Sequence, residues 1–330
     1  MLKVGLIGNG KISDAHKEAY KLNPDVSVEV YCDANPANLQ GLDNARTYTS
    51  VDEMLEKEQG KLDFVDICLP TFLHAEITIK ALEKGFHVFC EKPMARKAED
   101  AKKMLETAKR TGKTLMIGQC NRFYAPMEEM YKVIRSGELG KVRSAEFYRE
   151  GSEHIESFSK TSWFYNGQLS GGGMLDTHIH DVDLIRWLFG KPKAVSSAAV
   201  SVYTREGYDA VSTNYYYDNG MFVHAQSDWT ITHDKFNTRT TRINFEKGYI
   251  FADRTPGRQA FVKVTEDGQV TDLSHLLPFN GYTVEINYFI DCLKNGKPVE
   301  QCPPEQSADA VEIIIAEMRS ADANGERIAL

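Results

Sequence analysis

The chain has 330 residues, of which 42% are hydrophobic and 26% are charged, with a formal net charge of −8 and a pI near 5.7. This composition is typical of a globular protein of two domains, and the acidic balance excludes the basic face that nucleic-acid-binding proteins carry. No apolar stretch approaches the roughly 20 residues of a membrane span, and glycines interrupt the N-terminus too early for a signal peptide. We therefore expect a cytoplasmic protein that binds neither membranes nor nucleic acid.

Six cysteines are scattered along the sequence, and none of them forms a Cys-x-x-Cys pair. Four of the six lie at or near the ends of apolar runs that we interpret as strands. In a reducing compartment this spacing favours buried free thiols over disulfides or a zinc site. We therefore predict no metal centre.

The chain begins with a strand, a glycine turn and a helix. Residues 2–7 are apolar, residues 8–13 read GNGKIS, and a helical pattern follows. This is the context of a dinucleotide-binding fingerprint, in which Gly8 allows the tight turn and Gly10 lets a pyrophosphate approach the helix N-terminus. Ser13 replaces the third glycine of the fingerprint and is small enough for helix–strand packing. The turn therefore predicts a dinucleotide site.

The next apolar run, residues 26–31, is followed by Asp33. An acidic residue about 20 residues beyond the glycine turn, at the end of the second strand, is placed to bind the adenosine ribose hydroxyls. Its carboxylate would repel a 2′-phosphate, so the sequence favours NAD over NADP. The alternative is an aspartate that simply ends a strand.

Strands and helices then alternate to about residue 118, which predicts a parallel, doubly wound sheet. The expected strands are 64–69, 86–90 and 115–118, and the expected helices are 51–58, 75–84 and 98–110. Ligands on such sheets bind beyond the carboxyl ends of the strands. Polar segments lie at those ends, at residues 70–74, 91–93 and 119–122. Alternatively, Thr71 caps a helix and Glu91 with Lys92 forms a solvated pair.

Beyond residue 122 strand-like runs dominate, so we predict a Rossmann domain at 1–121 and an α+β domain with a large, mostly antiparallel open sheet at 122–330. The expected strands are 144–149, 194–203, 210–217, 221–228 and 238–245, and the expected helices are 126–136, 282–293 and 304–323. An open sheet face commonly forms a subunit interface, so we expect a homodimer or homotetramer assembled through this sheet.

Residues 170–183 read SGGGMLDTHIHDVD and combine close backbone approach with titratable side chains. On a helix over 174–189, Asp176 and His180 share one face, and a carboxylate one turn from an imidazole suits a general acid/base histidine. The alternative is an acidic helix N-terminus with structurally partnered histidines. His178 lies about 200° from His180 around the helix, so the two histidines do not converge on a metal. We expect His178 to be structural or substrate-contacting.

The ordered set of motifs resembles the Gfo/Idh/MocA family of NAD(P)-dependent oxidoreductases, which includes inositol and sugar dehydrogenases. The resemblance rests on Gly8-Asn9-Gly10, Pro70-Thr71 with His74, Glu91-Lys92-Pro93, Asn121-Arg122-Phe123, and Gly171-Gly172-Gly173 followed by Asp176 and His180. The tail over 281–330 also resembles the family. His178 adds a second histidine to the family motif.

The resemblance implies a dehydrogenase or reductase that acts on a secondary alcohol or ketone of a sugar, inositol or related polyol. His180 would take the hydroxyl proton, Asp176 would orient its ring, and Lys92 would hydrogen-bond the reacting oxygen. The predicted cofactor-binding residues are Gly8, Asn9, Gly10, Lys11, Ile12, Asp33, Leu69, Pro70, Thr71, His74, Glu91, Lys92, Gln119 and Asn121. The predicted substrate-binding residues are Lys92, Arg122, Trp163, Asp176, His180 and Tyr282.

Two other functions are compatible with the same residues. Some relatives are NAD-dependent glycosidases that oxidise a sugar transiently, eliminate the aglycone and reduce the sugar again. A few bind the dinucleotide and act as non-catalytic regulators, and these typically lose parts of the catalytic set. Retention of Lys92, Asp176 and His180 favours an enzyme.

Overall fold

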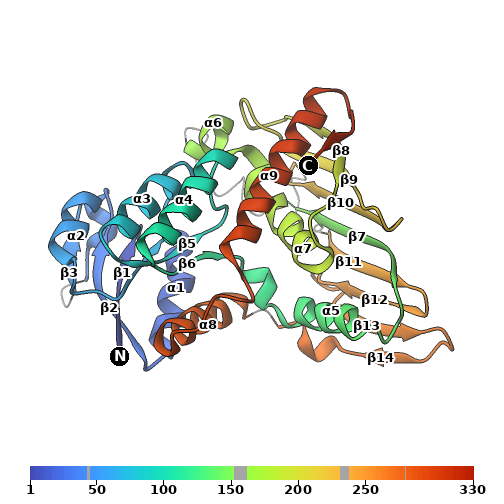
Figure 1. Cartoon of the computed structure of the whole chain (residues 1–330), viewed down its shortest axis with the longest axis horizontal. Helices are drawn as coiled ribbons and strands as arrows, with labels where there is room; N and C mark the ends of the chain where they lie inside the picture. The colour runs from blue at the N-terminus through green and yellow to red at the C-terminus, as the bar shows by residue number, and fades with distance from the viewer. Residues whose placement is uncertain (43–44, 152–161, 231–237, 279) are drawn as a thin grey trace. The chain divides into compact units, whose positions relative to one another are not determined.

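The computed structural model describes residues 1–42, 45–151, 162–230, 238–278 and 280–330. The chain forms two compact units (Figure 1), which we call the first unit and the second unit. The first unit comprises Met1–Phe123 with Asn280–Ala308, and the second comprises Tyr124–Phe279 with Asp309–Leu330. The sequence division placed all of 122–330 in one domain, whereas residues 280–308 pack with the first unit.

The first unit contains a six-stranded parallel sheet in the order β3-β2-β1-β4-β5-β6, which is the Rossmann order and confirms the predicted fold class. The strands are β1 (Leu2–Ile7), β2 (Val26–Cys32), β3 (Arg46–Tyr48), β4 (Phe64–Ile67), β5 (His87–Glu91) and β6 (Leu115–Gly118). The helices are α1 (Lys11–Leu22), α2 (Val51–Glu58), α3 (Thr71–Glu83), α4 (Ala98–Thr111) and α8 (Gly281–Asn295). The α3 helix begins at Thr71, four residues before the expected start, directly after the N-cap Pro70.

Packing of α8 explains why residues 280–308 belong to the first unit. The helix lies beside α1 (Figure 1), and its Phe289 ring packs at 5.4 Å, centroid to centroid, from both Phe64 of β4 and Phe89 of β5. These aromatic rings are fully buried and belong to one hydrophobic core with Val4 and Leu6 of β1. A sheet face of such apolar side chains must be covered, and α8 covers it.

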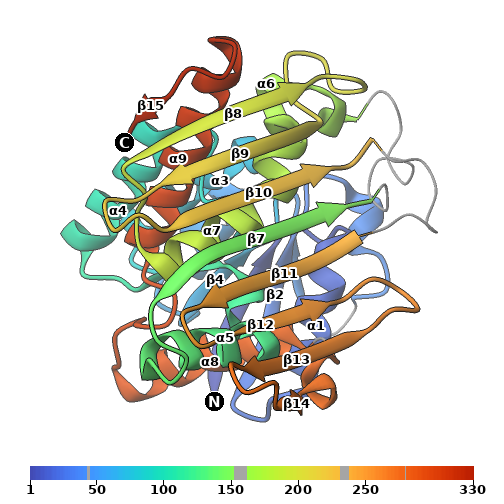
Figure 2. The same ribbon diagram turned by 90° about the vertical axis from the view of Figure 1, so that its right-hand side faces the viewer.

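The second unit contains a nine-stranded mixed sheet in the order β14-β13-β12-β11-β7-β10-β9-β8-β15, which Figure 2 shows. All neighbouring strands are antiparallel except β7 and β10, so the prediction of a large, mostly antiparallel sheet is confirmed. The strands are β7 (Val142–Glu150), β8 (Ala194–Val200), β9 (Ala210–Tyr216), β10 (Phe222–Asp228), β11 (Thr238–Phe245), β12 (Gly248–Asp253), β13 (Ala260–Thr265), β14 (Val270–Asp272) and β15 (Ile328–Ala329).

Helices cover one face of this sheet, behind it in Figure 2. They are α5 (Ala125–Ser136), α7 (Ile179–Phe189) and α9 (Pro304–Asp322). The α9 helix begins in the first unit. A further short helix, α6 (Gly167–Ser170), lies between α5 and α7 in the sequence. Their apolar side chains form one core with alternate residues of the strands, for example Ile185 of α7 with Phe147 of β7. Among the described residues, no helix covers the opposite face.

The predicted strand over 194–203 ends earlier, at Val200, because a carboxylate takes the next backbone donors. The N–H groups of Val202, Tyr203 and Thr204 donate to Asp209 Oδ2 at 2.6, 2.6 and 3.0 Å. Burial alone would raise the pKa of Asp209, but these hydrogen bonds lower it. The chain therefore turns back on itself instead of extending the ladder.

All six cysteines are free and buried, as the spacing predicted. Within the described ranges, no helix is both long enough and apolar enough to cross a membrane.

Candidate active site

The two glycines of the turn differ in what surrounds them. The backbone at Gly8 requires glycine, whereas Gly10 faces open space. Gly8 has φ +92°, and a Cβ there would lie 2.4 Å from the carbonyl oxygen of Cys68, so the fold itself requires glycine. Gly10 has an ordinary φ of −89° as the N-cap of α1, and a Cβ there would meet nothing within 4 Å. The fold does not require glycine at position 10, and the space above it is free to admit a ligand.

Asp33 ties the glycine turn to the loop that follows β2. Its Oδ2 accepts hydrogen bonds from Asn9 N at 2.8 Å and Asn38 Nδ2 at 3.1 Å, and its Oδ1 accepts one from Asn35 N at 2.8 Å. The Asn9 side chain is itself engaged, since Lys17 Nζ donates to its Oδ1 at 2.9 Å. Asp33 thus does more than end a strand, because it fixes the turn where the cofactor is expected.

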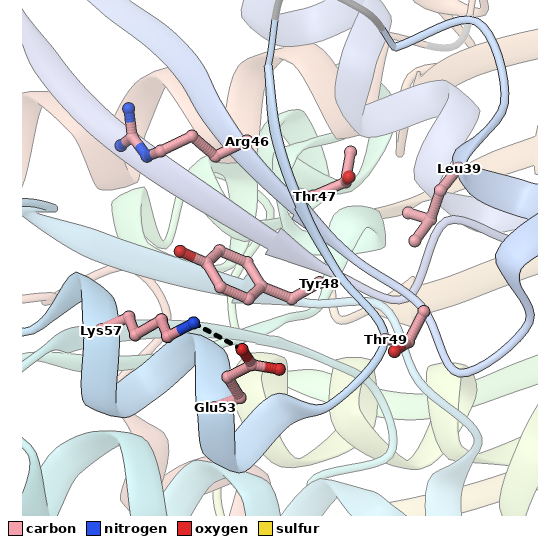
Figure 3. A pocket seen from close by; sticks show the side chains of 7 residues that line it. All are labelled: Leu39, Arg46, Thr47, Tyr48, Thr49, Glu53 and Lys57. Atoms are coloured by element: carbon pink, nitrogen blue, oxygen red, sulfur yellow. Dashed lines mark hydrogen bonds and ion pairs between the residues drawn. The ribbon is translucent and has the colours of Figure 1, made fainter.

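A second carboxylate faces the same end of β2. Burial, together with the negative charges of Asp33 and Glu53, raises the pKa of the Cys32 thiol to about 12. Glu53 also lines a cavity of about 440 Å³ beside the edge strand β3 (Figure 3). The two cations of this cavity are already paired, Lys57 with Glu53 at 2.6 Å and Arg46 with Glu58 at 3.0 Å. Glu53 is thus a second carboxylate near the end of β2, and it is ion-paired with Lys57. The cavity is lined by Leu39, Arg46, Thr47, Tyr48, Thr49, Glu53 and Lys57.

Two loops at the carboxyl ends of β4 and β5 are joined by His74. Its Nε2 lies 2.7 Å from the Leu69 carbonyl oxygen and its Nδ1 lies 2.7 Å from that of Pro93. Burial lowers the pKa of His74, although both carbonyl oxygens oppose that shift. With both nitrogens engaged by the backbone, His74 holds these two loops together.

The structure adds a buried polar network that the sequence did not reveal. His16 of α1 is fully buried, with Nδ1 2.8 Å from Asp66 Oδ2 and Nε2 2.9 Å from Glu91 Oε1. Tyr20 OH donates to Asp66 Oδ2 at 2.7 Å. Burial alone would lower the pKa of His16, but the charges and hydrogen bonds of Asp66 and Cys68 together outweigh burial and raise it well above its usual range. The signal in the sequence for this network was Asp66, an aspartate inside the otherwise apolar run of β4.

His16, Asp66 and Cys68 lie close enough together to suggest metal ligands. However, the 2.8 Å separation of His16 Nδ1 and Asp66 Oδ2 would subtend only about 90° at a zinc ion about 2.0 Å from each, far from tetrahedral. Burial also raises the pKa of Cys68 to about 12, which keeps it a thiol. These distances are those of hydrogen bonds.

Three further predicted residues lie near the ends of β5 and β6 or in the segment that follows β6. Tyr282 of α8 stands 6.1 Å from His16, ring centroid to ring centroid, and burial raises the pKa of its phenol far above the usual range. Gln119 and Asn121 are buried, and the Gln119 Nε2 donor has no hydrogen-bond partner among the described residues. Tyr282 belongs to the first unit, although the sequence analysis assigned it to the second domain.

Arg122 is fully buried. Its Nη1 donates to Gln306 Oε1 at 2.7 Å and to the Gln301 carbonyl oxygen at 3.2 Å. These contacts hold the segment that leads into α9, so Arg122 acts in the packing of the first unit.

In the second unit, the glycine-rich segment over 167–173 admits another segment of the chain. A Cβ at Gly167 would lie 2.1 Å from the Glu206 carbonyl oxygen, and one at Gly172, where φ is +68°, would lie 2.6 Å from that of Tyr208. Gly173 would meet the Trp229 ring, which packs on Phe164 in a cluster that Trp163 joins. The glycines thus allow close packing of this segment against residues 206–209 and Trp229.

The predicted helix over 174–189 is interrupted. Met174–His178 form a π-helical turn, and the α-helix α7 begins only at Ile179. Such single turns are frequent at functional sites. Along this stretch Asp176, Thr177 and His180 keep partial exposure, whereas Met174, Leu175, His178, Ile179 and the five residues after His180 are buried. The burial pattern therefore places Asp176 and His180 on the same exposed side.

His178 has structural partners within the second unit. The side chain is fully buried, with Nε2 3.1 Å from Tyr215 OH and 3.2 Å from Glu317 Oε2. These partners lie on β9 and α9. His178 therefore anchors the π-helical turn to the sheet and to the C-terminal helix of the second unit.

Next to this anchor, the carboxylate of Asp181 accepts two hydrogen bonds from Arg149, each at 2.8 Å, with both side chains largely buried. Burial alone would raise the pKa of Asp181, but the charge and hydrogen bonds of Arg149 lower it overall. Because the folded pKa lies below the unfolded value, the ionised pair stabilises the fold above about pH 4 and loses this effect as pH falls through the folded pKa.

We expect the substitution Asp181→Asn to destabilise the fold at neutral pH. The difference from wild type in unfolding free energy should shrink toward about pH 2. Urea titrations across this range test it; a difference independent of pH would contradict it.

The predicted catalytic residues thus divide between the units. Lys92 follows β5 in the first unit, beside Glu91 and the loop held by His74. Asp176 and His180 lie on the π-helical turn and α7 in the second unit.

Comparison with known proteins agrees with this architecture. Residues 2–119 match a family profile described as "Oxidoreductase family, NAD-binding Rossmann fold", and residues 127–251 match the GFO/IDH/MocA C-terminal domain. The WlbA dehydrogenase of Bordetella pertussis, solved with NADH and UDP-GlcNAcA, superposes with a TM-score of 0.87 at 23% identity and covers 100% of this chain and 97% of its own. At that identity the likeness shows the fold.

Two curated relatives from Escherichia coli K12 are similar over part of the chain. D-glucoside 3-dehydrogenase is 32% identical over 208 residues, which cover 61% of this chain and 57% of the relative. 2,7-Anhydro-N-acetylneuraminate hydratase is 29% identical over 198 residues, which cover 59% and 52%. The matched region thus spans little more than half the length of these relatives. The two family profiles together span most of the sequence, and the chain belongs to the Gfo/Idh/MocA family.

Proposed function

We propose that this chain is an NAD-dependent oxidoreductase that transfers a hydride between nicotinamide and a secondary alcohol or ketone of a sugar, inositol or related polyol. The observation that carries the proposal is the open space over Gly10 at the N-terminus of α1, in a family whose Rossmann domain binds NAD. The D-glucoside 3-dehydrogenase relative supports a sugar as the substrate class.

The residues of the first unit fit a dinucleotide. The first turn of α1 offers unpaired backbone N–H groups and the positive end of the helix dipole to a pyrophosphate, beside Gly8, Asn9, Gly10, Lys11 and Ile12. Asp33 has lone pairs for the ribose hydroxyls, and its negative charge opposes a 2′-phosphate. The unpartnered Gln119 donor at the end of β6 would be satisfied by a polar group of the ligand. Leu69, Pro70, Thr71, Glu91, Lys92 and Asn121 would complete the cofactor site.

The catalytic roles are assigned to three side chains. Nicotinamide, when bound, supplies the hydride acceptor or donor. His180 accepts the hydroxyl proton on a ring nitrogen in the oxidative direction and returns it in the reductive one. Asp176 stabilises the resulting imidazolium, and the Lys92 ammonium hydrogen-bonds the reacting oxygen and favours its negative charge. Trp163 and Tyr282 complete the substrate contacts.

The open face of the second-unit sheet supports assembly into a homodimer or homotetramer. Side chains that alternate with the buried core residues project from it, including the Tyr148–His224 pair, with centroids 5.9 Å apart, and Arg242 over Tyr249 at 4.2 Å. Phe222 is 48% exposed there. A broad face with aromatic and arginine side chains suits a subunit interface.

The hydratase relative favours a second candidate, a reaction on a sugar without net oxidation. The NAD-dependent glycosidase chemistry is of this kind, because transient oxidation allows elimination and the sugar is then reduced again. The same three side chains would serve both reactions.

The test uses purified protein with NAD⁺ or NADP⁺ and a panel of inositols, aldoses, and deoxy and amino sugars. We expect reduced nicotinamide to absorb in the near ultraviolet with NAD⁺ and one class of polyol, and NAD⁺ to bind more tightly than NADP⁺. Release of a chromogenic aglycone without net NADH would favour the second candidate. Tighter binding of NADP⁺ would refute the role of Asp33, and absence of binding to either dinucleotide would refute the proposal.

A further inference from the structure

We propose that His16 is a positioning residue, which clamps the Glu91 carboxylate between α1 and β5 and thereby holds the backbone of Lys92 in place. This inference rests on the proposed function for the catalytic role of Lys92, whereas the clamp itself is a property of the first unit alone. No direct contact between His16 and Lys92 is invoked.

The clamp joins three elements that are distant in sequence. His16 lies on α1, Asp66 on β4 and Glu91 at the end of β5. The imidazole stands between the two carboxylates, 2.8 Å from Asp66 Oδ2 and 2.9 Å from Glu91 Oε1, and all three side chains are at least 95% buried. Both carboxylates are acceptors, so the imidazolium form donates to each. The raised pKa of His16 agrees with that form.

Glu91 transmits the clamp to Lys92. While Oε1 faces His16, the other oxygen, Oε2, accepts a hydrogen bond from the backbone N–H of Lys92 at 3.0 Å. The next residue, Pro93, is held from the other side by His74 Nδ1 at 2.7 Å from its carbonyl oxygen. Lys92 therefore lies on a short segment whose backbone is fixed before and after it, while its own side chain keeps partial exposure.

This arrangement suits a residue that must present its ammonium group at a defined point. A displacement of about 1 Å can cost on the order of 10²-fold in rate, since catalysis depends on orientation. Loss of the His16–Glu91 bond would free the Glu91 carboxylate, and with it the Lys92 amide. A purely structural network would instead affect stability alone.

Two amide substitutions separate the two arms of the clamp. His16→Gln places an amide nitrogen near the position of Nε2 and preserves the bond to Glu91, whereas His16→Asn places it near Nδ1 and preserves only the bond to Asp66. Both remove the same charge. Tyr20→Phe is the matched control, because it removes the hydrogen bond to Asp66 Oδ2 and leaves the Glu91 arm intact.

The first readout is hydrogen exchange of the Lys92 amide, relative to the Val88 amide of the same strand, which donates to the Thr114 carbonyl oxygen. We expect this ratio to rise at least about 10-fold in His16→Asn and to stay near the wild-type value in His16→Gln and Tyr20→Phe. An unchanged ratio in His16→Asn, or an equal rise in both His16 variants, overturns the clamp. This readout does not require a substrate.

The second readout is steady-state turnover on the polyol found with the panel. We expect kcat to fall about 10- to 100-fold in His16→Asn, with KM and the NAD dissociation constant within about 2-fold, and to recover at least about 5-fold in His16→Gln. Faster exchange with unchanged kcat overturns the positioning role. If wild type oxidises nothing, the proposed function has failed, and the exchange ratio still decides the clamp.

Discussion

Replacing His180 with asparagine is expected to reduce kcat by about 10³-fold or more, within the range that a general acid/base contributes. Asparagine keeps a polar group at this position of α7 but cannot take up a proton at neutral pH. Because His180 belongs to the second unit and the glycine turn to the first, the dissociation constant for NAD should stay within about 2-fold of wild type. Steady-state turnover and nucleotide fluorescence titration measure the two quantities.

The matched control is His275→Asn, since His275 is an exposed histidine of the second unit on a short 3-10 turn. This variant should retain the wild-type kcat. Near-full turnover of His180→Asn would remove His180 from the mechanism, and equal losses in both variants would point to a general effect of histidine removal.

Replacing Gly10 with alanine is expected to weaken NAD binding at least about 10-fold, equivalent to about 1.4 kcal/mol, while leaving the fold intact. The added methyl group would enter the space expected for the pyrophosphate and would meet no protein atom within 4 Å. At φ −89° alanine is unstrained, and its poorer N-cap propensity should change the unfolding free energy by no more than about 1 kcal/mol. Isothermal titration with NAD and thermal unfolding separate the two effects.

Gly8→Ala provides the contrast two residues away. Its Cβ would clash with the Cys68 carbonyl oxygen at 2.4 Å, and φ is +92°, so this variant should lower the melting temperature markedly. Undiminished NAD affinity in Gly10→Ala would mean that the pyrophosphate does not approach this helix.

Much of the first unit follows from the sequence because its signals are local. A strand, a glycine pair and an amphipathic helix are contiguous, and each buried strand of the parallel sheet is a short apolar run between turn signals. The prediction for the second unit was less complete, since the sequence analysis did not predict strands β12 to β14. In β12 the buried residues alternate with half-exposed ones, and β14 is a short, exposed edge strand, so neither presents a continuous apolar run.

Features that depend on partners far apart in the sequence could not be predicted from the sequence alone. His16 meets Asp66 and Glu91 across 50 and 75 residues of chain, and a single histidine on a helix names neither partner. The burial of Arg122 also does not show in a motif, because its partners lie 179 and 184 residues away. The π-helical turn at residues 174–178 also has no periodic signature, because it departs from the 3.6-residue repeat by inserting one residue into the helix.

The return of α8 to the first unit has a consequence for synthesis of the protein. A nascent chain that has emerged as far as residue 123 holds all six strands of the parallel sheet, but it lacks the helix whose Phe289 covers Phe64 and Phe89. More than 150 further residues must be translated before that helix emerges. The apolar face of the early sheet is thus exposed for at least about 8 s at typical elongation rates of 5–20 residues per second, during which chaperones have access to it.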